Sequence, residues 1–383
     1  MSRVGPDCIS AEMIAWTGNR IPSRRVPIRH RRRPLLREPS RLVYSPEEMK
    51  VALTVFSLLS QSGSSIKNAL YDRGLIKPRR APIPVISVGN ISLGGTEKTP
   101  LAMELLARLS ALGRRPALVS RGYKGRWEKT GGILSDGRSI LGTWQDGGDE
   151  PYLIARTHPA AGVYVGKDRL ASCRRAATAG FDIVVLDDGF QHRRLARDVD
   201  IVLHSLKGKT GLRESLSALC RADIVLIKSG DEGSRGIEWL RHRANSRLFT
   251  YSVVARAVTD IRTGERVPAE KIAKTRFLAF CGIARPSRFL ETLRQAGLQT
   301  VSLLPFPDHH PYPSASLKKI NRAGRSRGAT ALITTAKDAV KLAGRVDECG
   351  EIPVYTLEIG LALEPGFEDC WRGLLEKRTG QCL

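Results

Sequence analysis

The chain has 383 residues, of which 42% are hydrophobic and 26% charged. This composition is typical of folded proteins and excludes a collagen-like or mainly disordered chain. The net charge is +24, of which residues 1–48 contribute only +5, so the remaining chain is itself basic. A basic body suits nucleic acid, an anionic membrane surface or a phosphorylated substrate. Only 6% of the residues are aromatic, which is little material for stacking on single-stranded nucleic acid.

The cysteines favour a reduced, cytoplasmic protein. There are seven, widely scattered and without a Cys-x-x-Cys pair, a spacing that matches neither a disulfide framework nor a zinc site. The start of the chain lacks the apolar stretch of a secretory signal. Residues 51–59 are apolar but too few to span a bilayer, which takes about 20 residues.

The first 80 residues contain two different segments. Residues 1–48 are rich in arginine and proline and are predicted to be poorly ordered. They are either an upstream extension of a protein that starts at Met49 or a basic targeting arm. Residues 49–80 place apolar side chains at helical spacing and end in basic residues. This pattern predicts an amphipathic helix, which either lies in a membrane interface or docks on its own domain.

Short apolar runs then alternate with helical patterns, which predicts an α/β fold with a parallel sheet covered by helices on both faces. The pattern restarts after about residue 250. We therefore expect a kinase-like domain over residues 81–250 and a smaller α/β lobe over residues 251–383. The predicted strands cover residues 84–88, 115–120, 181–186, 199–203, 223–227, 276–281, 301–304 and 329–335, and the predicted helices cover residues 98–112, 169–179 and 286–296.

Residues 87–100 resemble a phosphate-binding loop. A strand enters a glycine-bearing turn, and Lys98-Thr99 opens a helix. In such loops backbone N–H groups and the lysine hold phosphates, while the hydroxyl reaches Mg²⁺. The spacing departs from the usual motif at Ser92 and at Glu97, which stands where a glycine is expected. The candidate nucleotide-binding residues are Ser92, Leu93, Gly94, Gly95, Thr96, Glu97, Lys98 and Thr99.

Glu97 raises two alternatives. We expect its backbone to stay in an ordinary L-residue conformation, with the carboxylate turned toward a basic neighbour or solvent. Residual repulsion of the phosphates would then weaken ATP binding. The rival interpretation makes Glu97 a partner of Mg²⁺ or of a substrate-binding arginine.

A second segment supports the nucleotide-binding interpretation. The apolar run 181–186 ends in Asp187-Asp188, about where a P-loop protein places its Mg²⁺-holding aspartate. Paired aspartates at the end of a strand can also be turn residues. The two elements together, in this order, favour a Mg²⁺ site.

Several further segments make the resemblance specific. Taken in order, the chain resembles the tetraacyldisaccharide 4′-kinases of lipid A biosynthesis over residues 49–342, and the segments that carry this resemblance are residues 70–74, Gly89–Pro100, Ser120–Tyr123, Gly148–Pro151, Asp187–His192, Arg197-Asp198, Leu212–Glu214 and Phe306–His310. The resemblance implies a P-loop kinase that uses ATP and Mg²⁺ to phosphorylate the 4′-hydroxyl of a tetraacyl glucosamine disaccharide 1-phosphate. It also implies peripheral binding to the cytoplasmic face of the inner membrane, and no obligate protein partner is evident.

The resemblance also implies roles for individual residues. Lys98 would hold the β- and γ-phosphates. Asp149 and a histidine of the Asp-His-His segment, His309 or His310, would deprotonate the 4′-hydroxyl. The candidate metal ligands are Thr99, Asp187, Asp188 and Glu150, and the candidate substrate contacts are Arg121, Arg213, Glu214, Gln191 and His192. Arg285 is a further candidate for phosphate contact, and for each arginine a solvated salt bridge is the competing interpretation.

The chain departs from the family pattern at three places: Glu97, a short segment at residues 204–211, and Ala336, where the family usually has glutamate. These departures leave open a degenerate nucleotide-binding paralogue with impaired kinase activity. A nucleic-acid-binding P-loop protein, suggested by the charge alone, ranks last because no recognition element is present.

Overall fold

The computed structural model describes residues 68–92, 97–205, 212–231, 233, 235–243, 246–268, 272 and 274–381. Most of the predicted amphipathic helix therefore lies outside the described residues, and only its end, residues 68–72, is described as helical. Residues 1–48 lie outside them as well. Within the described part of the chain, no helix is both long and apolar enough to cross a membrane.

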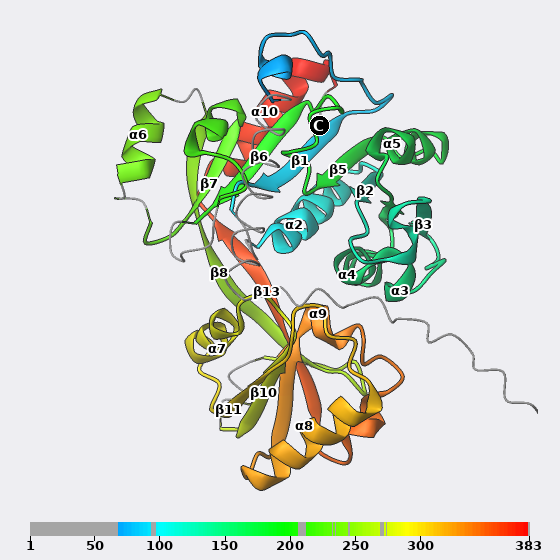
Figure 1. The fold of residues 1–383 in the computed structure, drawn as a ribbon, viewed down its shortest axis with the longest axis vertical. Helices are drawn as coiled ribbons and strands as arrows, with labels where there is room; N and C mark the ends of the chain where they lie inside the picture. The colour runs from blue at the N-terminus through cyan, green and yellow to red at the C-terminus, as the bar shows by residue number, and fades with distance from the viewer. Residues whose placement is uncertain are drawn as a thin grey trace, which may run out of the picture. The chain divides into compact units, whose positions relative to one another are not determined.

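The described strands form a 13-stranded sheet in the order β11-β10-β12-β13-β8-β7-β6-β1-β5-β2-β4-β3, with β9 paired to β8 (Figure 1). The strands are β1 (Val85–Asn90), β2 (Pro116–Ser120), β3 (Gly132–Asp136), β4 (Gly162–Val165), β5 (Ile183–Asp187), β6 (Val199–His204), β7 (Ile224–Lys228), β8 (Arg247–Asp260), β9 (Arg266–Val267), β10 (Phe277–Cys281), β11 (Thr300–Pro305), β12 (Ala331–Thr335) and β13 (Val354–Leu363).

The sheet is mixed. Neighbouring strands from β8 to β4 along this order run parallel, as do those from β11 to β13. The edge strand β3 and the central pair β8–β13 are antiparallel, which the predicted parallel sheet did not include. The first part of β8 pairs with β7, and its remaining residues extend beyond β7. The chain later returns in the opposite direction as β13 and pairs with this extension, so β8 and β13 are antiparallel.

The helices cover both faces, as predicted. They are α2 (Lys98–Ala111), α3 (Trp144–Gly147), α4 (Asp149–Thr157), α5 (Arg169–Thr178), α6 (Arg235–Arg243), α7 (Pro286–Gln295), α8 (Ser314–Ser326), α9 (Ala336–Ala339) and α10 (Phe367–Thr379), with short 3₁₀ helices η1 (Arg126–Glu128), η2 (Leu216–Arg221) and η4 (Val346–Cys349).

The buried apolar residues form two separate sets of clusters, one at each end of the sheet. One group packs α2, α4 and α10 on one face of β1–β7, and α5 and α6 on the other. We call this part the nucleotide lobe. In the other group α7 and α8 cover opposite faces of β10–β12, and we call this part the C-terminal lobe. Alternating strand residues enter the cores on the two faces, so β1, β2, β4, β6 and β10 are buried along their whole length, whereas β3, β8, β9 and β11 are partly exposed.

The predicted elements match the structure closely, usually within one or two residues at each end. The elements that the sequence did not predict are β3, β4, β8, β9, β13, α3, α4, α6, α8, α9 and α10. The domain boundary at residue 250 stays a prediction. Phe367 and Trp371 of α10 are buried in the core of the nucleotide lobe, although they fall within the segment 251–383 that was assigned to the C-terminal lobe.

Candidate active site

Of the predicted nucleotide-binding residues, the described ones, Ser92 and Glu97 to Thr99, follow β1 and begin α2. Val88 of β1 pairs with Asp187 of β5, so the carboxyl ends of these parallel strands meet at one edge of the sheet. α2 begins there at Lys98. The Lys98 Nζ lies 2.8 Å from Asp188 Oδ1 and 3.1 Å from Asn90 Oδ1. The structure thus brings together the lysine and the aspartates that the sequence placed 90 residues apart.

The two aspartates differ in their electrostatics. Burial, with the nearby carboxylates of Asp188 and Glu150, raises the pKa of Asp187 to about 6. Burial also disfavours ionised Asp188, but the cations of Lys98 and Arg213 outweigh it and lower the pKa of Asp188 to about 2. The negative charge of Asp187 is therefore not fully compensated by its neighbours, whereas Asp188 is paired with Lys98 and Arg213.

This donor set fits Mg²⁺. Among the described residues, no three His, Cys, Asp or Glu side chains are grouped as a complete metal site. Mg²⁺ does not require such a group, because it usually takes one or two carboxylates together with phosphate and water oxygens. A divalent cation bound here would offset the repulsion from Asp188 and Glu150 that, with burial, raises the pKa of Asp187.

Glycine is required where the loop leaves β1. A Cβ on Gly89 would lie 2.4 Å from the Cβ of Phe190, so no larger residue fits against the chain that follows Asp188. Leu93, Gly94, Gly95 and Thr96 of the loop lie outside the described residues. Ser92, which is buried, pairs with Leu212, and Thr99 lies in the first turn of α2.

The backbone expectation for Glu97 is wrong, and the side-chain expectation is confirmed. Glu97 has φ +54°, in the left-handed region, because the chain needs this turn to enter α2. Its carboxylate accepts hydrogen bonds from Lys228 Nζ (3.3 Å), Arg288 Nη1 (3.1 Å) and the Tyr251 hydroxyl (3.2 Å). The carboxylate therefore points to basic neighbours.

A carboxylate and an imidazole from the two lobes meet. His309 Nδ1 lies 3.0 Å from Asp149 Oδ2, and both side chains are nearly buried. Asp149 begins α4, directly after Gly148, whose φ of +89° only glycine adopts easily. Burial opposes the charge on Asp149, but His309 and Lys341 more than offset it, so the pKa of Asp149 lies below its usual value.

His310 lies in a different environment. Its ring stacks on Phe306 with centroids 4.7 Å apart, and its Nε2 lies 2.9 Å from Ser316 Oγ. Burial and the nearby Lys341 lower the pKa of His310. Of the two candidate histidines, the structure brings only His309 to Asp149.

The sequence analysis missed two lysines at this site. Lys341 is fully buried, and its Nζ lies 2.7 Å from Asp149 Oδ2. The Lys337 Nζ lies 2.6 Å from Glu150 Oε1 and 3.4 Å from His309 Nε2. Both come from the segment after β12. Their spacing was a usable signal, because residues four apart in a helical turn lie on the same side of it.

The candidate substrate residues are spread around this edge. Arg213 pairs with Asp188 (3.0 Å), and Glu214 pairs with Arg221 (2.7 Å). Gln191 donates to the carbonyl of Asn90 (2.7 Å), and the His192 N–H donates to the carbonyl of Gly189 in the turn after β5. These four residues lie around the loop that follows β5.

Arg121 lies at the end of β2 and pairs with Glu128 (2.6 Å), with half of its side chain exposed. A salt bridge, the competing interpretation for this arginine, is therefore present. Arg285 precedes α7, and burial lowers its pKa, with the Arg288 cation adding to this effect.

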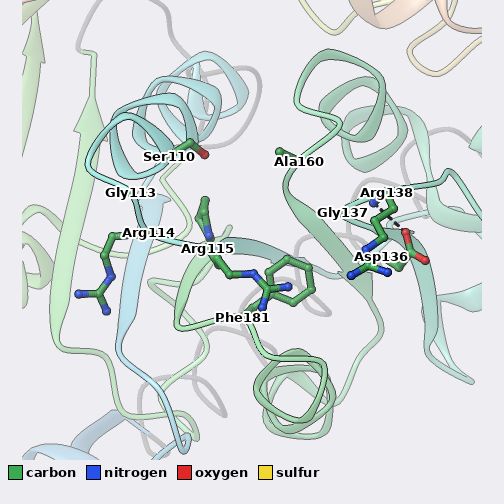
Figure 2. Close-up of a pocket in the computed structure, with 10 residues that line it drawn as sticks. Ser110, Gly113, Arg114, Arg115, Asp136, Gly137, Arg138, Ala160 and Phe181 are labelled. Carbon is green, nitrogen blue, oxygen red and sulfur yellow. Dashed lines mark hydrogen bonds between the residues drawn. The ribbon is translucent and has the colours of Figure 1, made fainter.

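A pocket of about 360 Å³ lies elsewhere (Figure 2). Its walls include Arg114, Arg115 and Phe181, with the Arg115 guanidinium 5.5 Å from the Phe181 ring centroid. These residues precede β2 and β5, so the pocket is at the amino ends of the strands. Ligands of open parallel sheets bind at the carboxyl ends, and the pocket is therefore not the nucleotide site.

Comparisons with known proteins identify the family of the chain. Residues 49–376 match the family model described as tetraacyldisaccharide-1-P 4′-kinase. The tetraacyldisaccharide 4′-kinase of Syntrophus aciditrophicus is 39% identical over 338 residues, covering 82% of this chain and 89% of that protein. The enzyme of the same name from Pelobacter propionicus is 38% identical over 352 residues, covering 87% and 94%.

One solved structure is also similar. LpxK from Aquifex aeolicus, crystallised in complex with ATP, is 29% identical with a TM-score of 0.67, covering 86% of this chain and 99% of that one. A match of this extent in sequence and in structure settles membership: the chain belongs to the tetraacyldisaccharide-1-P 4′-kinase family.

Proposed function

We propose that this chain transfers the γ-phosphate of ATP to the 4′-hydroxyl of a tetraacyl glucosamine disaccharide 1-phosphate and so forms the 1,4′-bisphosphate. The observation that carries the proposal is the His309–Asp149 pair, assembled next to Glu150, whose carboxylate acts on Asp187 at the nucleotide site. A base and a phosphate-binding lysine are thus held at one edge of the sheet.

Lys98 and Thr99 are the residues we assign to ATP. Lys98 supplies a cation for the β- and γ-phosphates, whose charge must be neutralised during phosphoryl transfer. Thr99 with Asp187 and Asp188 would hold Mg²⁺, and Glu150 would assist them. Mg²⁺ held by these residues would supply positive charge that offsets the charge on the phosphates.

His309 is the residue we assign as general base. A carboxylate can only accept, so Nδ1 of His309 carries the hydrogen that faces Asp149. The ammonium of Lys337 can only donate, so Nε2 carries the lone pair. The neighbours on both sides therefore favour the same tautomer, the one in which Nε2 accepts a proton.

The step balances without a further reactant. The 4′-oxygen attacks the γ-phosphorus while its proton passes to His309 Nε2, the bond between the γ-phosphorus and its bridging oxygen breaks, and ADP leaves. Asp149 stabilises the resulting imidazolium. Lys337 must move from Nε2 before the hydroxyl can approach.

The acceptor and its location are further parts of the proposal. Arg213, Arg121 and Arg285 would contact phosphates, and Glu214, Gln191 and His192 would contact the sugar. The 1-phosphate and acyl chains make the acceptor an anionic amphiphile, which suits the net charge of +24. We place the protein at the cytoplasmic face of the inner membrane, attached peripherally through residues 49–80.

A degenerate paralogue is not favoured. His309 contacts Asp149, Lys98 contacts Asp188, and the carboxylate of Glu97 is balanced by the cations of two basic residues. A nucleic-acid-binding function is not favoured either, because the basic residues at the site lie near the proposed nucleotide-binding residues.

The test is phosphate transfer from γ-labelled ATP to purified tetraacyl disaccharide 1-phosphate in detergent micelles. We expect label in a bisphosphate product, formed at least about a hundredfold more slowly when His309 is replaced by alanine. A folded protein that binds ATP without labelling the lipid would support the degenerate paralogue instead.

A further inference from the structure

Glu97 is the residue where this chain breaks the phosphate-loop pattern, and the structure gives its carboxylate three partners from three elements. Lys228 ends β7, Tyr251 lies on β8 and Arg288 lies on α7 of the C-terminal lobe. The Glu97 side chain is only 11% exposed. The loop residue thus reaches from the nucleotide lobe to the C-terminal lobe.

The contacts surround the place where the two lobes join. Lys228 and Tyr251 are the last pair of the β7–β8 ladder. Tyr251 is also the first residue of β8 to pair with β13, opposite Leu363. Beyond this point β8 leaves the nucleotide lobe, so a movement between the lobes would disturb the hydrogen bonds of Glu97.

The charges show why the carboxylate is tolerated there. A lone carboxylate beside a phosphate site would repel the ligand, and left-handed backbone is unfavourable for glutamate. Here Lys228 and Arg288 contribute two positive charges to one negative charge, so the cluster stays cationic toward the phosphates. Tyr251, neutral because burial raises its pKa, only donates.

A chain of contacts leads from Arg288 to the base. α7 begins at Pro286, four residues after Gly282. The Gly282 carbonyl accepts from the N–H of His309 at 3.0 Å. The segment that carries Arg288 is therefore bonded to the backbone of the residue that faces Asp149.

We propose that Glu97 is a positioning residue that ties the nucleotide-binding loop to α7 through Arg288 and so holds the C-terminal lobe where His309 meets Asp149. The inference rests on the proposed function in one respect, namely that His309 is the base. It keeps the expected basic neighbours of Glu97 and replaces repulsion of ATP by a structural role for them, and it does not use the rival interpretation, in which Glu97 binds Mg²⁺ or a substrate-binding arginine.

The first test is a double-mutant cycle in the full chain, with Glu97→Gln and Arg288→Met. Each variant should lower kcat about tenfold, the scale of one lost charge-assisted hydrogen bond, with a smaller change in the KM for ATP. The double variant should be little worse than either single one, because Glu97→Gln removes the charge from the contact that Arg288→Met removes altogether. Arg294→Met, on an exposed position of α7, is the matched control and should not change kcat.

The second test needs no turnover. Hydrogen–deuterium exchange of the substrate-free protein should show faster exchange in peptides 282–295 and 306–312 of Glu97→Gln and Arg288→Met, but not of Arg294→Met. Unchanged exchange in β4 and β5 would show that the fold is intact. If Glu97→Gln does not fold, Arg288→Met breaks the contact from the other side.

Two outcomes would overturn the proposal. One is unchanged exchange in both peptides when either partner of the contact is removed. The other is a Glu97→Gly variant with unchanged kcat and a lower KM for ATP, which would restore the repulsion interpretation. If the variants exchange faster but the wild-type protein does not label the lipid, the proposed function fails and the role of Glu97 in holding the C-terminal lobe stands.

Discussion

The Nδ1 of His309 lies 3.0 Å from Oδ2 of Asp149, although 160 residues separate the two in the chain. Asp149 begins α4 of the nucleotide lobe, and His309 follows β11 of the C-terminal lobe. His309 has φ +64°, an uncommon conformation for histidine, and its ring meets the edge of Tyr123. The pair joins the two lobes, so the base that we propose meets its carboxylate partner only in this arrangement of the lobes.

His309→Ala should lower kcat by about 10²–10⁴, because general base catalysis contributes about that much. His310→Ala removes a ring that packs on Phe306 and should lower kcat less than tenfold. The measurement is kcat at saturating ATP and lipid. Equal losses in both variants would contradict the assignment of His309.

Lys98→Ala should lower kcat by at least about a hundredfold, because it removes the cation that balances phosphate charge in the transition state. The fold should survive, since Lys98 contacts Asp188 and Asn90 at the edge of the sheet rather than the core. Lys129→Ala, at an exposed position, is the control. Circular dichroism spectra that match wild type would confirm the fold, and a wild-type kcat in Lys98→Ala would remove the P-loop assignment.

Asp187 and Asp188 should affect stability in opposite directions in a chelating buffer. The pKa of Asp187 is raised to about 6, so its contribution to stability is complete at low pH and is lost as the pH rises through 6. Asp187→Asn should therefore stabilise the metal-free protein above pH 6, by about 2 kcal/mol, and have little effect near pH 4.

The pKa of Asp188 is lowered to about 2, so its contribution is present above its ordinary value near 4 and is lost as the pH falls toward 2. Asp188→Asn should destabilise the protein at neutral pH. Thermal unfolding of both variants between pH 4 and 8 measures the two effects. A destabilised Asp187→Asn at pH 7 would show that burial does not strain this carboxylate.

Lys341→Met should lower the free energy of unfolding by about 3 kcal/mol, since removing one member of a buried ion pair leaves the other uncompensated. The groups left behind are Asp149 at 2.7 Å and Asp338 at 3.8 Å. Lys318→Met, at an exposed position of α8, is the control and should change stability little. Urea unfolding measures both, and equal stability of the two variants would exclude a structural role for the buried ammonium.

Truncation should separate the extension from the membrane contact. A chain that starts at Met49 should keep wild-type activity, because no motif lies upstream. Further removal of residues 49–75 should raise the KM for the lipid far more than that for ATP and release the protein from anionic vesicles. Unchanged sedimentation with vesicles would refute the interfacial helix, and lost activity in the first truncation would make the extension functional.

The sequence alone was sufficient for the strands and helices whose pattern is local. β1, β5 and β6 are continuous apolar runs, and α2 and α5 have helical spacing, so their positions follow from burial on both faces of a sheet. The approach of Lys98 to Asp188, beyond the carboxyl ends of β1 and β5, was also predictable, because parallel strands must bring their carboxyl ends to one edge.

Only the tertiary structure decided between His309 and His310. They are neighbours in sequence with the same chemistry, and a left-handed turn at His309 directs the two rings to different surroundings. It also decided the contacts of Lys337, Lys341 and Arg288. Their partners are distant in the chain, and no local pattern encodes a contact between two lobes whose placement depends on the return of β13 along β8.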